Sequence, residues 1–465
     1  MMTIEWLLTF TSTLFIVLFY IFIIRSLLAA NSNLFLIGSC FGILFFYVTP
    51  LIILSITGRF EKGIFLSVVD LKDIDITEDI VPVLIMHGLL VILGVTIYLI
   101  GIFSRNANAY GNAIQRNNII DFKKDKKRLI KLIIILGGFY VLFVARDLVS
   151  NNIFSGDAHW YESRHDSMSV ENGSIINVIF TYLRNNSRLV FFAALIYGWY
   201  QKVYKNDYIF LVVYLVSIGL DIYVSGNRFI LAATGILIAY ILILKKKYIF
   251  ITVCSFLAYP IAWLGTVFMS VRGVMYSQAS TFGELITLFK EKGAEANDQF
   301  IFVLINMVEG INFNTYVSLY YNAPKKIPFL LGETFITPLV FWIPRSVWEN
   351  KPPRVGQIIG EAYVGNPDLS LVATFLGESW LNFGYVSFII IPFLFIIAFK
   401  FINAAVRHME PGIRSFILFL LGFTLMRASY GSVFVDVFVM SMYISLVLLI
   451  IQKKIYFFGR QVNFK

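Results

Sequence analysis

The stretch VPVLIMHGLLVILGVTIYLIGIF, residues 81–103, contains no Asp, Glu, Lys or Arg. An uncharged apolar run of this length matches the roughly 20 helical residues that cross the hydrocarbon of a bilayer. Similar runs recur along the 465-residue chain, which is 58% hydrophobic and has a mean hydropathy of +0.78. A soluble domain cannot cover so much apolar surface with its few polar groups. The sequence therefore predicts an all-α polytopic membrane protein.

We expect about eleven transmembrane helices, and one more pair of spans or re-entrant segments would keep the same orientation. The expected spans are 6–24, 33–56, 81–103, 129–146, 175–200, 208–225, 229–244, 249–270, 384–402, 413–431 and 433–451. The chain then divides into an N-terminal bundle of about eight spans (1–270), a long loop (271–383), and about three C-terminal spans with a tail (384–465). The first run lacks a preceding basic region, which indicates a retained span rather than a cleaved signal peptide.

The basic residues lie in short blocks between the apolar runs. Segment 104–128 is the densest block, with Arg105, Arg116, Lys123, Lys124, Lys126, Lys127 and Arg128 against Asp121 and Asp125. By the positive-inside rule this block is cytoplasmic, and Lys245–Lys247, Arg407, Lys453 and Lys454 then fall on the same side. Loops 57–80 and 147–174 are acidic and fall outside. The net charge of +10 therefore encodes orientation, with the N-terminus outside and the C-terminus inside, rather than nucleic-acid binding.

Metal and cofactor signatures are absent from the sequence. Cys40 and Cys254 both fall within expected spans and suit small apolar packing positions. The segment GDAHWYESRHD (156–166) puts His159, Glu162 and Asp166 on one face if it is helical, and such a set can hold a divalent ion. Its spacing matches no established zinc signature, so we expect a polar loop, no metal and no cofactor. No P-loop, dinucleotide fingerprint or nucleophile elbow occurs in a convincing context.

The long loop 271–383 carries an unusual rigid and cationic segment, FWIPRSVWENKPPRVG (341–356). In the expected orientation the loop faces outward, and its apolar parts 300–321 and 327–343 predict a structured lid over the outer mouth of the bundle. Arg345 lies between Trp342 and Trp348, and a guanidinium group matches phosphate oxygens while indole faces stack on sugars. The alternative is an interfacial loop whose tryptophans anchor it and whose cations meet lipid headgroups. Both readings stay open on these residues alone.

Two arginine–glycine pairs share one spacing within this loop. Arg272 is followed after ten residues by Gly283, and Arg345 after ten residues by Gly356. With 31 glycines in the chain, one such pair is a weak signal. Two pairs in one outer loop, each beginning at an arginine close to the membrane, are more informative.

With these pairs and with the stretches VSGNRFILA (224–232), FWIPRSVWENKP (341–352) and LGESWLNFGYVSF (376–388), the chain resembles the Wzy-type O-antigen and capsule repeat-unit polymerases. In the arrangement of spans and loops the resemblance covers most of the chain, whereas in amino-acid sequence it covers only these stretches. It implies a bacterial inner membrane, a GT-C-like helical bundle and a large periplasmic loop. It also implies substrates carried on undecaprenyl diphosphate, with the growing glycan transferred to a new repeat unit at the periplasmic face. A chain-length regulator and a flippase of the same pathway are implied partners.

Arginine and lysine are the candidate ligands of the diphosphate, because cations stabilise the charge that grows on a departing phosphate. Arg272 and Arg345 are the catalytic candidates, and the further candidates for diphosphate or glycan binding are Arg228, Arg354, Lys351, Arg184, Arg188 and Arg427. Solvated loop charges are the alternative for Lys351 and Arg354, and a snorkelling arginine for Arg228. Arg427 has a possible structural partner in Asp436 or Asp221.

Glu378, in GESWLNFG, is the candidate general base, since the attacking sugar hydroxyl must lose a proton. The alternative is a carboxylate that neutralises one of the arginines. Glu361 and Glu333 are weaker candidates. Aromatic platforms for sugar rings are expected from Trp342, Trp348, Trp380 and Tyr276, each of which also suits an interface anchor.

The favoured function is therefore a membrane glycosyltransferase that polymerises lipid-linked oligosaccharides. A ligase that transfers the glycan to lipid A-core has a similar layout and remains the enzymatic alternative. A lipid-linked oligosaccharide flippase is the alternative of another class. Its polar groups are expected among the helices rather than concentrated in one outer loop, which favours the enzyme.

Overall fold

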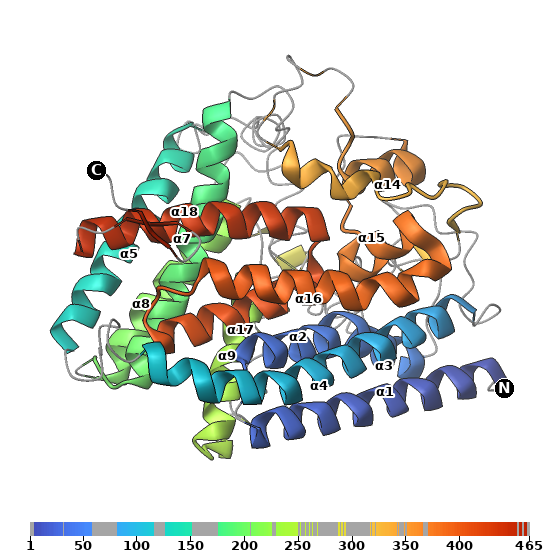
Figure 1. Ribbon diagram of the computed structural model, residues 1–465, viewed down its shortest axis with the longest axis horizontal. Coiled ribbons are helices and arrows are strands. Elements are labelled where there is room, and N and C mark those ends of the chain that lie inside the picture. Colours follow the sequence, from blue (N-terminus) through green and yellow to red (C-terminus); the bar gives the residue numbers. More distant parts are fainter. Residues whose placement is uncertain are drawn as a thin grey trace.

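Helices form nearly all of the chain that the computed structural model describes (Figure 1). The described residues are 4–30, 32–57, 81–115, 126–150, 175–204, 206–225, 229–249, 322–341, 343, 348, 351–365, 371–452, 455–457 and 460–462, with isolated positions between 252 and 320. Among them, the only strands are β1 (Ile455–Phe457) and β2 (Arg460–Val462), an antiparallel pair in the tail.

The N-terminal helices coincide with the expected spans. They are α1 (Ile4–Ala29), α2 (Leu34–Ile43), α3 (Thr49–Thr57), α4 (Val81–Gln115), α5 (Lys126–Ser150), α7 (Ile175–Tyr200), α8 (Asp207–Ser225) and α9 (Phe229–Leu244). A π-helical turn, Leu44–Val48 (η1), joins α2 to α3, so the second expected span is continuous but changes its register. The eighth, 249–270, lies largely outside the described residues.

The C-terminal half contains short elements followed by three long helices. Two 3-10 turns, η2 (Glu333–Phe335) and η3 (Thr337–Leu339), precede the helices α14 (Val355–Val364) and α15 (Thr374–Phe383). After η4 (Gly384–Val386) come α16 (Ser387–Ala405), α17 (Pro411–Arg427) and α18 (Tyr430–Gln452). Gly384 has a φ of +53°, a conformation that favours glycine, and it turns the chain between α15 and α16.

Several helices are those of a multi-pass membrane protein. Six segments of the described residues are long and apolar enough to cross a bilayer: Leu7–Ala29, Leu34–Ile53, Val81–Ser104, Leu129–Arg146, Thr374–Ala405 and Tyr430–Leu449. Helix α9 is apolar but shorter. Large apolar side chains along α1 and α8, including Phe15, Phe22, Val212 and Val216, are exposed, as expected of faces that meet lipid. The count of eleven spans stays a prediction.

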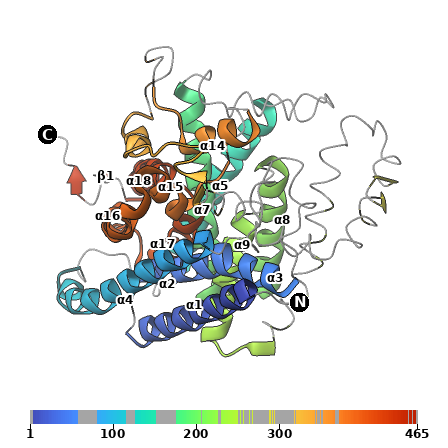
Figure 2. The ribbon, with the colours of Figure 1, turned by 90° about the vertical axis from the view of Figure 1, so that its right-hand side faces the viewer.

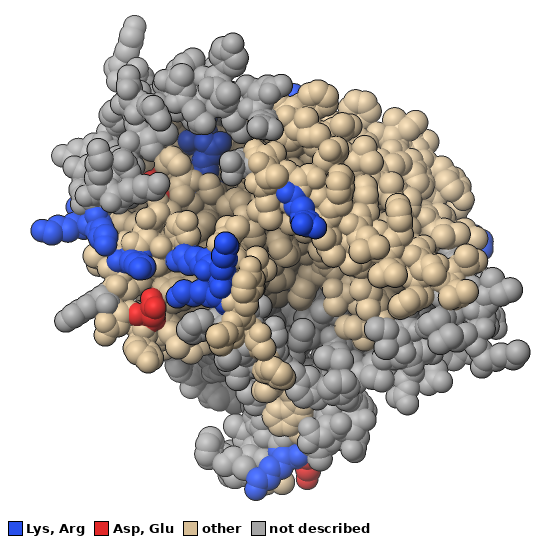
Figure 3. Space-filling model, turned by 90° about the horizontal axis from the view of Figure 1, so that it is seen from below, with Lys and Arg blue, Asp and Glu red and all other residues tan. Residues whose placement is uncertain are grey.

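Side-chain hydrogen bonds join other helix ends to the end of α16 and the start of α17. Asn33 donates a hydrogen bond to Asn403 (2.7 Å), and Tyr197 donates one to Glu410 (2.9 Å). The expected orientation puts all four residues on the cytoplasmic side, and this stays a prediction. Figure 3 shows Lys and Arg residues gathered on part of the face seen from below, with few acidic residues beside them.

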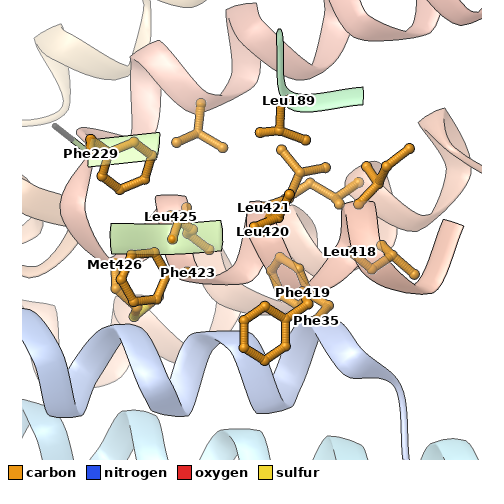
Figure 4. Packing of buried hydrophobic residues seen from close by; sticks show 14 of the residues in the cluster. Phe35, Leu189, Phe229, Leu418, Phe419, Leu420, Leu421, Phe423, Leu425 and Met426 are labelled. Atoms are coloured by element: carbon orange, nitrogen blue, oxygen red, sulfur yellow. The ribbon is translucent and has the colours of Figure 1, made fainter. Parts of the chain in front are cut away.

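Helix α17 lies at the centre, between α2, α7 and α9 (Figures 1 and 2). Every residue from Phe416 to Phe423 is buried, which is the pattern of a helix surrounded by others. Helix α2 packs so closely against it that a Cβ on Gly38 would overlap the carbonyl oxygen of Phe419. The ring of Phe229 from α9 lies 5.8 Å from that of Phe423, centroid to centroid (Figure 4). This packing fixes the end of α17 that leads to the candidate site.

Candidate functional site

A cavity of about 70 Å³ brings together three of the residues singled out by the sequence, Glu378, Lys351 and Arg354. It lies between α7, η2 and η3, the segment before α14, α15, and the beginning of α18. The other lining residues are Tyr182, Thr334, Thr337, Pro338, Phe341, Ile343, Pro352, Val355, Ser429, Gly431, Ser432 and Val435. Two cations and a carboxylate thus share one small, partly apolar space.

Glu378 is buried on α15, and its carboxylate is held at the first turn of α18. Its Oε2 accepts a hydrogen bond from the N–H of Tyr430, and the N–H of Gly431 and the hydroxyl of Thr334 also donate to the carboxylate. The first N–H groups of a helix have no partners within the helix, and its N-terminus attracts negative charge. The side chain therefore ties α15 to α18 while lining the cavity.

A hydrogen-bond network behind Glu378 holds the 3-10 turns in place. Asn382 donates to the Thr334 hydroxyl and to the backbone carbonyl of Glu378, both at 2.8 Å. Its side-chain oxygen accepts from the N–H of Gly332 at 3.0 Å. Since Thr334 is in turn a donor to Glu378, the orientation of this carboxylate is fixed from two elements.

The two cations come from the proline-rich segment before α14. The Nζ of Lys351 donates to the backbone carbonyls of Ile343 (2.8 Å) and Phe341 (3.2 Å), which fastens the segment upon itself. The backbone N–H of Arg354 donates to the side chain of Gln357 (2.9 Å) at the start of α14. The guanidinium of Arg354 lies close enough to Asp436 and Tyr182 to interact electrostatically with both.

Asp436 is a second carboxylate beside the cavity, and the sequence interpretation considered it only as a partner for Arg427. It is the one charged residue in α18. Its Oδ1 is buried and has no hydrogen-bond partner among the described residues, while Arg188 and Arg354 lie close enough to interact with its charge. A lone acid in an otherwise apolar span is the signal that could have identified it.

The three remaining candidate arginines among the described residues occupy different surroundings. Arg188 on α7 forms an ion pair with Asp221 on α8, with 3.1 Å between Nη1 and Oδ2, and both side chains are nearly buried. Arg184 is buried one turn earlier on α7. Arg427, at the end of α17, lies 4.9 Å above the ring of Phe229. Asp221 therefore pairs with Arg188, and a pairing of Arg427 with Asp436 or Asp221 stays a prediction.

The two candidate tryptophans among the described residues, Trp348 and Trp380, are placed differently. Trp380 is buried and packs edge-on against Tyr320 and Tyr385, with centroids 5.4 and 5.1 Å away. Because neither face is open to solvent, we replace its expected role as a sugar platform by one in core packing. Trp348, at 36% exposure, keeps an accessible ring.

Five predicted site residues, Arg228, Arg272, Tyr276, Trp342 and Arg345, lie outside the described residues, as does the His- and Asp-containing segment 156–166. Among the described residues there is no group of three His, Cys, Asp or Glu side chains that could hold a metal ion. What the described site offers is two cations that can hold an anion and two carboxylates that can accept a proton.

Comparison of the chain with protein-family models, with curated proteins and with solved structures finds no match in any of the three.

Proposed function

We propose that the chain is a membrane glycosyltransferase that polymerises oligosaccharide repeat units carried on undecaprenyl diphosphate. The observation that carries the proposal is the cavity in which Lys351 and Arg354 meet Glu378. Lys351 and Arg354 belong to the stiff cationic segment before α14, whereas Glu378 belongs to the buried helix α15. A sugar transfer from a lipid diphosphate needs both kinds of group within one site.

In the proposed reaction, a hydroxyl of the incoming repeat unit attacks the anomeric carbon of the growing glycan. A new carbon–oxygen bond forms, the bond from that carbon to the diphosphate breaks, and the hydroxyl proton passes to Glu378. Arg354 and Lys351 stabilise the negative charge that builds up on the departing undecaprenyl diphosphate. Arg272 and Arg345 are proposed to join them from the same loop, with Arg228 between two spans.

The proposal includes the arrangement in the bacterial inner membrane. About eleven spans are expected, with the N-terminus and the loop 271–383 in the periplasm and the C-terminus in the cytoplasm. The loop then covers the periplasmic mouth of the bundle as a lid. A chain-length regulator and a flippase of the same pathway are the proposed protein partners. No metal or cofactor takes part in the proposed transfer.

The test is reconstitution of the purified chain in vesicles with an undecaprenyl-diphosphate-linked repeat unit. A ladder of glycan products supports the polymerase. A single transfer to lipid A-core would identify a ligase, and movement of the substrate without a new bond a flippase. Either of these last two results overturns the proposal.

Glu378→Gln is expected to reduce ladder formation by at least about 100-fold, since a general base contributes roughly 10²- to 10⁴-fold. The matched control is Glu291→Gln, which changes an exposed carboxylate of the same long loop and should leave the ladder intact. Because Glu378 also holds the start of α18, thermal unfolding and binding of the lipid diphosphate are measured for both variants. Full activity of folded Glu378→Gln would remove this residue from the proposed chemistry.

A further inference from the structure

Two helices of the bundle end in the same unusual way. Lys202 after α7 and Lys246 after α9 have φ angles of +53° and +55°, in the left-handed region. At α7, the N–H of Lys202 bonds to the carbonyl of Trp199 and that of Val203 to Gly198, both at 3.0 Å. The position that adopts this conformation at a helix end is most often glycine.

The end of α9 has the same hydrogen bonds. The N–H of Lys246 bonds to the carbonyl of Ile243 and that of Lys247 to Leu242, both at 2.9 Å. Glycine would adopt this backbone without strain at either helix end. Lysine at both positions therefore carries a conformational cost, and its positive charge is the property that glycine would lack. A strained residue kept at two equivalent positions points to a role for its side chain.

These lysines belong to a larger group, which we call the lysine cluster: Lys126, Lys202, Lys245, Lys246 and Lys247. Lys126 from α5 donates its Nζ hydrogen bond to the carbonyl of Lys202 at 3.2 Å. Burial lowers the pKa of Lys245, and the nearby charges of Lys247 and Lys202 lower it further. Asp207 acts in the opposite direction, and its carboxylate already accepts a hydrogen bond from Trp199 Nε1 at 3.1 Å. Positive charge thus converges here from three elements, and among the described residues Asp207 is the acid that acts against it at Lys245.

Aromatic side chains lie next to the lysine cluster in space or along the chain. The Nζ of Lys245 lies 4.6 Å from the ring centroid of Tyr200 and 5.1 Å from that of Trp199. Tyr208 and Tyr248 expose 78% and 60% of their surface. Tyrosine and tryptophan concentrate at the level of the lipid headgroups, where one part of the ring is apolar and the other is wet.

Exposed apolar side chains follow these aromatic residues along the chain. On α8, which starts at Asp207, the side chains of Ile209, Leu211 and Val212 are exposed. Ile249, following Tyr248, exposes 80% of its surface. The lysine cluster therefore lies at the level where the lipid-facing surface ends and the phosphate groups of a bilayer begin. A lysine at a helix C-terminus also interacts favourably with the negative end of the helix dipole. This interaction explains one lysine at each helix end, but it does not explain why five lysines gather at one place.

We propose that the lysine cluster binds the phosphate group of an anionic phospholipid. The ammonium groups would contact the phosphate oxygens, the tyrosines would lie among the headgroups, and the exposed side chains of α8 would contact the acyl chains. Binding joins the ends of α5, α7 and α9, since it offsets the mutual repulsion of their lysines. The proposal does not depend on the transferase activity.

The test measures thermal unfolding of the full chain in neutral detergent with added phosphatidylglycerol, phosphatidylcholine or inorganic phosphate. Phosphatidylglycerol is expected to stabilise the protein at concentrations at which the other two do not. In the double variant Lys202→Gly/Lys246→Gly, stability without lipid should be equal or higher, because glycine fits both backbone positions. Its apparent affinity for phosphatidylglycerol should fall at least threefold.

Lys245→Gln/Lys247→Gln removes two charges without touching the strained positions and should weaken the same lipid at least threefold. The matched control is Lys400→Ala, an exposed lysine on α16, which should change nothing. Equal stabilisation by phosphatidylcholine or by inorganic phosphate would overturn the proposal. So would unchanged affinity for phosphatidylglycerol in both double variants.

Discussion

At the scale of single residues, buried charges distinguish this bundle from a purely apolar one. The Glu378 carboxylate accepts hydrogen bonds from backbone N–H groups, whereas Arg188 and Asp221 neutralise each other. Charges are rare in membrane-embedded helices because they are costly there, and they persist where a partner or a functional site compensates them. The two carboxylates are therefore compensated in different ways, Glu378 by hydrogen bonds at the candidate site and Asp221 by an ion pair.

The ion pair gives a prediction that separates structure from function. Asp221→Asn leaves the Arg188 charge nearly buried without its carboxylate, and breaking such a pair costs about 3–5 kcal/mol. The double variant Arg188→Met/Asp221→Asn removes the stranded charge and should recover at least half of the lost stability. Thermal unfolding in detergent measures both. Asp207→Asn, an exposed acid on the same helix, is the control and should cost less than about 1 kcal/mol. Equal losses in the single and double variants would show that the pair is not what stabilises this region.

The residues of the candidate site were only partly predictable from the sequence. Glu378, Lys351 and Arg354 stood out because polar side chains are conspicuous beside apolar runs, and they line one cavity. Asp436 was passed over because a carboxylate inside a span first suggests an ion pair. The burial of Trp380 could not be predicted, since it depends on Tyr320 and Tyr385, which approach it through the fold.

At the scale of helices, hydropathy predicted where helices form, but not where they change course. The second expected span contains the π-helical turn Leu44–Val48, within which Tyr47 donates a hydrogen bond to the carbonyl of Met426 at 2.9 Å. The span expected from residue 384 is preceded by the buried helix α15, which carries Glu378. Both features arise from tertiary contacts, and an apolar run contains no signal for either.

The close packing of α2 on α17 can be tested with glycine substitutions. A Cβ at Gly422 would overlap the carbonyl oxygen of Phe35, and backbone atoms on a packed helix cannot yield cheaply. Gly422→Ala should therefore cost at least about 1–3 kcal/mol, read from thermal unfolding in detergent. Gly235→Ala on α9, which would contact nothing within 4 Å, is the matched control and should be neutral or stabilising by up to about 1 kcal/mol. Similar behaviour of the two variants would contradict this packing.

At the scale of the whole molecule, the lysine cluster and the candidate cavity involve different groups of helix ends. The lysine cluster lies at helix ends that the sequence predicts to be cytoplasmic. The cavity lies between helix ends predicted to be on the other side, such as the start of α18. The charge pattern along the sequence predicts these two sides because each span reverses the direction of the last, and the orientation itself stays a prediction. The charge pattern could not predict the cavity, which requires α7, α15 and α18 to converge.

Cysteine labelling tests the orientation. In a Cys40→Ala/Cys254→Ala background, Pro353→Cys lies at an exposed position beside Arg354, and Arg407→Cys at an exposed position after α16. A membrane-impermeant maleimide should label Pro353→Cys in intact spheroplasts, and Arg407→Cys only after permeabilisation. The reverse pattern would place the cavity in the cytoplasm, where no periplasmic transfer can occur.

The position of α17 at the centre of the bundle also dictates an order of assembly. Gly42 of α2 lies against Met426, almost a full chain length later in translation. At about 5–20 residues per second, a ribosome needs roughly 20 to 80 s to synthesise the intervening polypeptide. Throughout that interval the glycine face of α2 has none of its contacts with α17. The helices can therefore complete their packing only after α17 and α18 have been inserted. A nascent chain released earlier lacks α17, the helix at the centre of the bundle.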